Sequence, residues 1–177
     1  AVHRAHTIAR RIREGIEHLA GDTPTGRQAR RSFGFANRAM AAQRRATAIT
    51  ALRADDATLS YADACARVAG PGNATWRPFQ LAFVLLNLPA LTDPTRQERT
   101  GCVDLLFFPT GGGKTEAYLG LAAYTFAIRR LQGIVGTGPE ARDGSDGVAV
   151  LMRYTLRLLT AQQFQRAAAL VCAAEVI

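Results

Sequence analysis

One lysine stands in a chain that otherwise uses arginine for its positive charges. The 177 residues include 22 lysines and arginines, and Lys114 is the only lysine among them. It lies in the run Pro109-Thr-Gly-Gly-Gly-Lys-Thr115. Glycines let backbone N–H groups approach phosphates closely, a lysine ammonium can reach the β- and γ-phosphates, and a threonine hydroxyl can hold Mg²⁺. The spacing therefore predicts a phosphate-binding loop of the P-loop (Walker A) type, with ATP and Mg²⁺ as its ligands.

The residues expected to act at this loop follow from the motif. Lys114 and Thr115 are expected to be catalytic, and Thr115 is expected to bind Mg²⁺. The residues expected to contact the nucleotide here are Thr110, Gly111, Gly112, Gly113, Lys114, Thr115 and Glu116. The sequence departs from the general pattern at Phe108, which stands where a glycine is usual. The plainer alternative is a glycine-rich turn without a ligand.

The elements around the loop predict an α/β fold. Residues 102–108 form a short apolar run before the loop, which is typical of a buried parallel strand, and residues 114–131 are expected to be helical. A glycine-rich connection over 132–147, a second buried strand over 148–152 and a helix over 158–174 follow. This order predicts a right-handed parallel crossover, as in the first half of a P-loop RecA-like lobe over residues 76–177.

Residues 1–75 are predicted to form a separate, basic α-helical region. Helices are expected over 2–20 and 27–53, and Ser60 with Asp63 resembles a capping box for a short helix. The stretch 70–73, Gly-Pro-Gly-Asn, marks the boundary, and a helix over 77–88 is expected to end at Pro89. Residues 1–54 hold 11 arginines against three acidic residues. Such a basic region suits a nucleic-acid backbone, although a solvated helix face or a surface covered by further chain fits the pattern equally well.

Composition excludes several classes of protein. No apolar run approaches the ~18 residues of a membrane span. The three cysteines are far apart and pair with none of the three histidines, so a zinc site is not expected and the thiols are interpreted as those of a cytoplasmic protein. The chain opens without a methionine, which favours a fragment that starts inside a helix.

Three segments together resemble superfamily-two helicases. The loop is similar to their motif I, and Trp76-Arg-Pro-Phe-Gln80 resembles the segment in which a glutamine reads adenine. Tyr154-Thr-Leu-Arg-Leu-Leu-Thr-Ala-Gln162 is similar to motif Ia, which touches the DNA backbone. The resemblance implies nucleotide contacts for Gln80 and Arg77. It implies DNA contacts for Arg153, Thr155, Arg157 and Gln162. Alternatively, Gln80 is an ordinary helix residue and Thr155 an ordinary helix cap.

The most specific resemblance is to the helicase subunit of the DISARM anti-phage defence system. It rests on the phrases 109–121 and 152–167, with weaker likeness at 33–40 and 76–91. It implies ATP-driven helicase or translocase work on DNA, together with other subunits of a bacterial defence complex and without a membrane.

The acidic segment that orients metal and water in such ATPases is missing from the sequence. We therefore expect a fragment that binds nucleotide but hydrolyses little ATP alone, with Val148, Val150 and Leu151 on an exposed sheet edge and poor solubility. Two alternatives remain: another P-loop ATPase that pumps DNA, and a truncated, non-catalytic nucleotide-binding scaffold.

Overall fold

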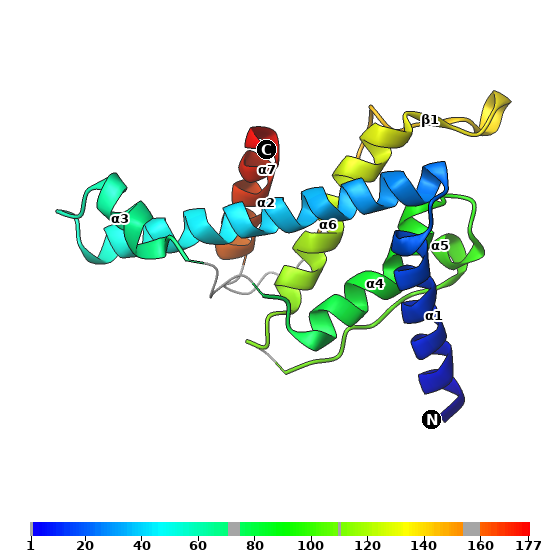
Figure 1. The fold of residues 1–177 in the computed structure, drawn as a ribbon, viewed down its shortest axis with the longest axis horizontal. Coiled ribbons are helices and arrows are strands. Elements are labelled where there is room, and N and C mark those ends of the chain that lie inside the picture. Colours follow the sequence, from blue (N-terminus) through cyan, green and yellow to red (C-terminus); the bar gives the residue numbers. More distant parts are fainter. Residues whose placement is uncertain (1, 71–74, 110, 154–159) are drawn as a thin grey trace.

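A computed structural model describes residues 2–177, except 71–74, 110 and 154–159, as a helical molecule (Figure 1). The helices are α1 Val2–Ala20, α2 Pro24–Asp55, α3 Tyr61–Val68, α4 Pro78–Thr92, α5 Gln97–Gly101, α6 Lys114–Gln132 and α7 Thr160–Val176. A short hairpin pairs β1 (Ile134–Val135) with β2 (Arg142–Asp143), and a 3₁₀ turn, η2 (Gly138–Glu140), lies between them. None of the helices in the described part of the chain is long and apolar enough to cross a membrane.

The long helix α2 is the element around which the others assemble. It runs along the longest axis of the molecule and carries α3 at its far end (Figure 1). Its Thr23 side chain accepts a hydrogen bond from the Gly26 amide, which caps the helix. The helix α3 is capped in the same way by Ser60, whose hydroxyl accepts from the Asp63 amide at 3.1 Å, as the sequence predicted.

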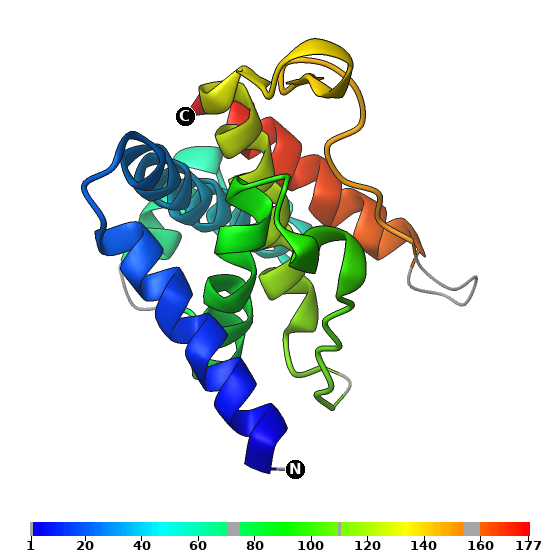
Figure 2. The ribbon, with the colours of Figure 1, turned by 90° about the vertical axis from the view of Figure 1, so that its right-hand side faces the viewer.

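The main core lies where α2, α4, α6 and α7 meet (Figure 2). Leu88 of α4, Leu119 and Ile128 of α6, and Leu170 of α7 are almost completely buried in it. Buried leucine and isoleucine side chains each contribute about 1.5–3 kcal/mol to folding, so this cluster holds the helices together. Figure 2 shows the four helices gathered around it, with α1 on the outer side of α4.

Contrary to the prediction, α4 does not end at Pro89 but continues to Thr92. Proline lacks an N–H, so the carbonyl of Leu85, four residues earlier, loses its helical donor. The backbone of α1 approaches α4 at this point: a methyl group on Gly15 would lie 2.0 Å from the Leu85 oxygen. Glycine at position 15 therefore allows α1 to pack directly on the interrupted part of α4.

The predicted α/β architecture is wrong for the described residues. Their only strands are β1 and β2, which pair antiparallel, and no parallel P-loop sheet is present among them. Neither 102–108 nor the described residues of 148–152 is a strand. The described fold is instead a packed set of helices, in which the phosphate-loop motif precedes α6.

The physical reason is that these two segments bury only part of their apolar surface and have no strand beside them. Val103, Leu105 and Phe107 are 84–96% exposed, whereas the intervening Asp104 and Leu106 face the helices. Val148 and Leu151 are also exposed, and Val150 packs on the main core. A strand is stabilised by hydrogen bonds to a neighbouring strand, so apolar composition alone did not produce one here.

Candidate nucleotide-binding site

The phosphate loop has the backbone conformation that its glycines predict. Gly111 and Gly113 have φ angles of +80° and +91°, a region that other residues rarely adopt. Gly113 is also the N-cap of α6 and offers no side-chain cap to that helix. The N-cap of α6 therefore supplies no side-chain acceptor to the amides of the first turn, where the positive end of the helix dipole lies.

Two glycines are also required by their surroundings. A methyl group on Gly112 would lie 2.4 Å from a ring carbon of Phe108. One on Gly113 would lie 2.7 Å from the amide nitrogen of Gln80. The ring of Phe108 in turn stacks on Phe79, with 3.9 Å between ring centres. Phe108, the departure from the usual motif, thus packs against the loop and the start of α4.

The start of α4 holds the loop through two side chains. Arg77 donates from Nη1 to the carbonyl oxygen of Gly112 at 2.8 Å. Gln80 donates from Nε2 to the carbonyl oxygen of Gly113 at 2.7 Å, and its Oε1 accepts from the Arg77 amide at 2.9 Å. The Gln80 side chain is buried, and both ends of its amide are engaged within the protein. The two residues that the sequence proposed as nucleotide ligands therefore lie beside the loop and contact its backbone.

Lys114, Thr115 and Glu116 form the start of α6, directly after the loop. Lys114 donates from Nζ to the carbonyl oxygens of Phe108 and Pro109, the latter at 3.1 Å. These contacts hold the ammonium across the loop, next to the first turn of α6. Thr115 is half-buried, and Glu116 forms an ion pair with Arg166 of α7. The second carboxylate oxygen of Glu116 is buried without a partner among the described residues.

A metal would find few ligands in the described residues. No cluster of three histidine, cysteine, aspartate or glutamate side chains there could hold one. Thr115 is the residue of the motif whose hydroxyl could supply a single oxygen to Mg²⁺, with the remaining ligands coming from phosphate and water. The described residues therefore do not by themselves form a metal site.

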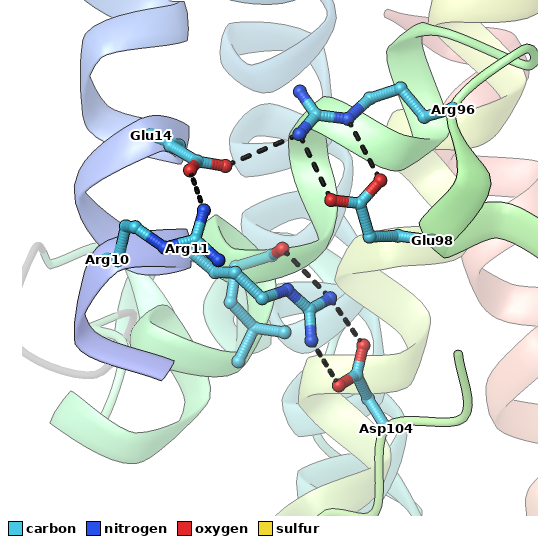
Figure 3. Close-up of polar contacts among 7 residues, drawn as sticks. Arg10, Arg11, Glu14, Arg96, Glu98 and Asp104 are labelled. Carbon is cyan, nitrogen blue, oxygen red and sulfur yellow. Dashed lines mark hydrogen bonds and ion pairs between the residues drawn. The ribbon is translucent and has the colours of Figure 1, made fainter. Parts of the chain in front are cut away.

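The segment that leads into the loop is tied to α1 by an ion pair (Figure 3). Arg11 donates to both carboxylate oxygens of Asp104, at 2.6 and 2.7 Å, and to the Leu86 carbonyl oxygen at 3.4 Å. The hydrogen bonds to Asp104 raise the pKa of Arg11 above its usual value, so the guanidinium stays charged. Arg11 is nearly buried, and two parallel hydrogen bonds fix its orientation as well as its position.

A second group of charges supports the same junction. Figure 3 shows Arg96 between Glu14 of α1 and Glu98 of α5, with nitrogen–oxygen distances of 3.3 and 3.2 Å. Arg10 completes the chain of contacts by pairing with Glu14. Helices α1 and α5 are therefore linked by charge on the side from which the loop segment departs.

Sequence reasoning missed Asp104 and Arg11, although one signal was available. Asp104 is the single charged residue in the apolar run 102–108, and a charge in such a setting requires a partner. Trp76 was noted only as the start of the segment that resembles an adenine-reading one, and its contact was not foreseen: its Nε1 donates to Asn37 Oδ1 at 2.7 Å. Trp76 packs on Gly120 of α6, where a methyl group would meet its ring at 2.6 Å. With Gln80, it lines a cavity of about 190 Å³ beside the loop.

The expected DNA-contacting residues are only partly described. Thr155 and Arg157, like Thr110 of the phosphate loop, lie outside the described residues. Arg153 is exposed, and Gln162 is exposed in the first turn of α7. These two residues are accessible to a ligand, and their role stays a prediction.

Comparison with known proteins gives one similarity. The chain is 55% identical over 103 residues to the DISARM protein DrmA of Bacillus paralicheniformis. The match covers 58% of this chain but 9% of that protein, so the chain spans less than a tenth of this relative's length. No family model and no solved structure matches the chain. At this level of identity the chain is related to a DISARM protein over more than half of its length.

Proposed function

We propose that this chain is the ATP-binding part of an ATP-dependent DNA helicase or translocase that acts in bacterial phage defence. The observation that carries the proposal is the phosphate loop itself. A methyl group on Gly112 or Gly113 would collide with a neighbouring side chain, and Lys114 donates to a carbonyl oxygen of the loop. The α6 helix follows directly, and its N-cap, Gly113, has no side chain to cap it. The similarity to a DISARM protein supports the defence role and the assembly with other subunits.

Each residue of the site has a distinct part in this proposal. The ammonium of Lys114 leaves the carbonyl oxygens of Phe108 and Pro109 and neutralises the outer phosphates. The loop amides and the end of α6 bind the same phosphates, and Thr115 supplies one oxygen to Mg²⁺. Arg77 and Gln80 keep the carbonyl oxygens of Gly112 and Gly113 turned away from the phosphates. ATP, when bound, supplies the free energy of its terminal phosphoanhydride bond.

A lysine suits this position better than the arginine used elsewhere in the chain. Its ammonium is a compact charge on a flexible stem, whereas a guanidinium is planar and larger. The loop carbonyls that hold Lys114 lie five and six residues before it, so the ammonium moves only a short way to a bound phosphate.

The proposal is tested with Lys114→Ala in the protein as its bacterium makes it. DNA-stimulated ATP hydrolysis is expected to fall at least tenfold, and resistance to phage, measured as plating efficiency, is expected to be lost. Arg13→Ala, which removes an exposed cation of α1, serves as the matched control and should leave both unchanged. Full resistance with the Lys114→Ala protein would contradict the proposal and favour a scaffold that needs no nucleotide.

A further inference from the structure

The arginines of α2 divide into paired and unpaired groups. Arg27 pairs with Asp22 at 3.2 Å, and Arg30 donates to the Gly21 carbonyl oxygen at 2.9 Å. Among the described residues, no carboxylate lies within salt-bridge distance of Arg31, Arg38 or Arg45. These three recur every seven residues, so they lie along one side of the helix. All three are exposed, which leaves a line of uncompensated charge on α2.

A groove lies beside this line of charge, between α2, α6 and α7. Its volume is about 880 Å³. Figures 1 and 2 both show α2 and α6 crossing with α7 beside them. Four arginines line the groove, Arg30, Arg31 and Arg38 of α2 and Arg130 of α6, together with one acidic residue, Glu175 of α7. The groove is therefore strongly positive.

Two aromatic rings distinguish this groove from an ordinary basic surface. Phe35 of α2 and Phe126 of α6 line it, and each is only partly buried by the core. Partly exposed aromatic rings next to guanidinium groups offer stacking surfaces for flat bases and charge for phosphates. Duplex DNA hides its base faces, and an acidic peptide supplies charge without flat rings. Of these ligands, a single nucleic-acid strand matches both features.

We propose that this groove binds single-stranded nucleic acid, with phosphates on Arg31, Arg38 and Arg130 and bases against Phe35 and Phe126. Under the proposed function this strand is the DNA on which the ATP-driven protein works. The site is separate from the motif Ia residues Arg153 and Gln162, which do not line the groove. It lies on the carboxyl-terminal half of α6, whereas the phosphate loop lies at the other end of that helix.

The test is fluorescence anisotropy of a labelled 20-nucleotide dT strand with the whole chain, across 50–200 mM NaCl and without nucleotide. The groove variant carries Arg31→Gln, Arg38→Gln and Arg130→Gln. The control carries Arg4→Gln, Arg13→Gln and Arg67→Gln, which removes equal charge at exposed sites outside the groove. Circular dichroism checks that both variants fold.

The groove variant is expected to bind at least tenfold more weakly. Its slope of log affinity against log salt concentration is expected to become less negative by about 2. The control is expected to bind within threefold of the unaltered chain. Inorganic polyphosphate and polyglutamate of equal charge, which lack bases, are expected to compete at least tenfold less well than unlabelled dT strand.

Equal losses in both variants would show attraction by net charge alone and overturn the proposal. Competition by polyglutamate that matches dT would overturn it in favour of an acidic polypeptide ligand. Lys114→Ala should leave dT binding unchanged, because the strand site does not use the phosphate loop. If the proposed function is wrong, ATP binding and hydrolysis will not depend on Lys114, whereas binding of the dT strand will still depend on the groove arginines.

Discussion

Gln80 connects α4 to the phosphate loop through a single side-chain amide. Its nitrogen donates to Gly113 and its oxygen accepts from Arg77, so both ends of the amide are engaged within the protein in this structure. A glutamine that reads adenine would need both ends of its amide facing the base. The observed contacts favour an effect on nucleotide binding through the loop backbone.

Gln80→Ala is therefore expected to weaken ATP and GTP binding by about the same factor. The loss of two hydrogen bonds of about 1 kcal/mol each corresponds to roughly tenfold or more in affinity. Asn87→Ala, which removes another amide of α4 that donates to Phe83, is the control and should change neither affinity. Calorimetric titration with both nucleotides measures the effect. Loss of ATP binding with GTP binding unaltered would show direct reading of the base.

At the scale of elements, α1 positions the segment that enters the loop. Its backbone touches α4 at Gly15, and its Arg11 holds Asp104. Because Asp104 lies only a few residues before the loop, the packing of α1 on α4 reaches the candidate site. The close contact at Gly15 is the part of this junction most sensitive to a small change.

Gly15→Ala is expected to lower the free energy of unfolding by at least ~2 kcal/mol, because the new methyl group would lie 2.0 Å from the Leu85 oxygen. Gly34→Ala in α2 is the matched control, since its nearest neighbour would be the end of the Arg38 side chain at 3.7 Å. That change should stabilise by up to ~1 kcal/mol through helix propensity. Urea denaturation compares the two. Equal stabilisation by both changes would show that α1 does not pack on α4 as described.

At the scale of the whole molecule, Tyr124 is a titratable side chain buried in the main core, and its ionisation opposes folding. Thr92 gives its hydroxyl proton to the Leu88 carbonyl oxygen at 2.8 Å, so Tyr124 is the donor in the contact between the two hydroxyls. Burial raises the pKa of Tyr124 to about 12.

The folded state thus binds the Tyr124 proton more tightly than the unfolded chain, whose tyrosine has a pKa near 10. The resulting contribution to the free energy of unfolding is present in full below pH 10 and is lost as the pH rises toward 12. Two pKa units correspond to about 3 kcal/mol. Tyr124→Phe is expected to cost about 1 kcal/mol at pH 7 and to flatten the fall in stability between pH 10 and 12. Denaturation at a series of pH values checks this, and an equal alkaline fall in both proteins would contradict it.

The sequence predicted local features of this molecule far better than its architecture. The glycines of the loop, the helix after it and the cap at Ser60 follow from neighbouring residues, and the structure has them. The parallel sheet was wrong because strand formation depends on partners that are distant in the chain. Residues 102–108 are apolar enough for a buried strand, yet Val103, Leu105 and Phe107 face outward.

Long-range side-chain contacts were equally invisible in the sequence. Arg11 and Asp104 are 93 residues apart, and the sequence around each of them does not indicate which residue it pairs with. Arg77 and Gln80 were predicted to contact the nucleotide directly. In the structure they donate hydrogen bonds to carbonyl oxygens of the loop. In each case the sequence supplied the residue type, and the packing of α1, α4 and α6 decided what it contacts.

The most direct test of the central claim is calorimetric titration of the chain with Mg²⁺ and ATP, compared between the unaltered protein, Lys114→Ala and Arg13→Ala. The account predicts saturable binding that weakens at least tenfold in Lys114→Ala, because the phosphates lose their closest cation, and stays within twofold in Arg13→Ala. Binding that is absent from the unaltered chain, or that is the same in all three proteins, would contradict the assignment of this loop as a nucleotide site.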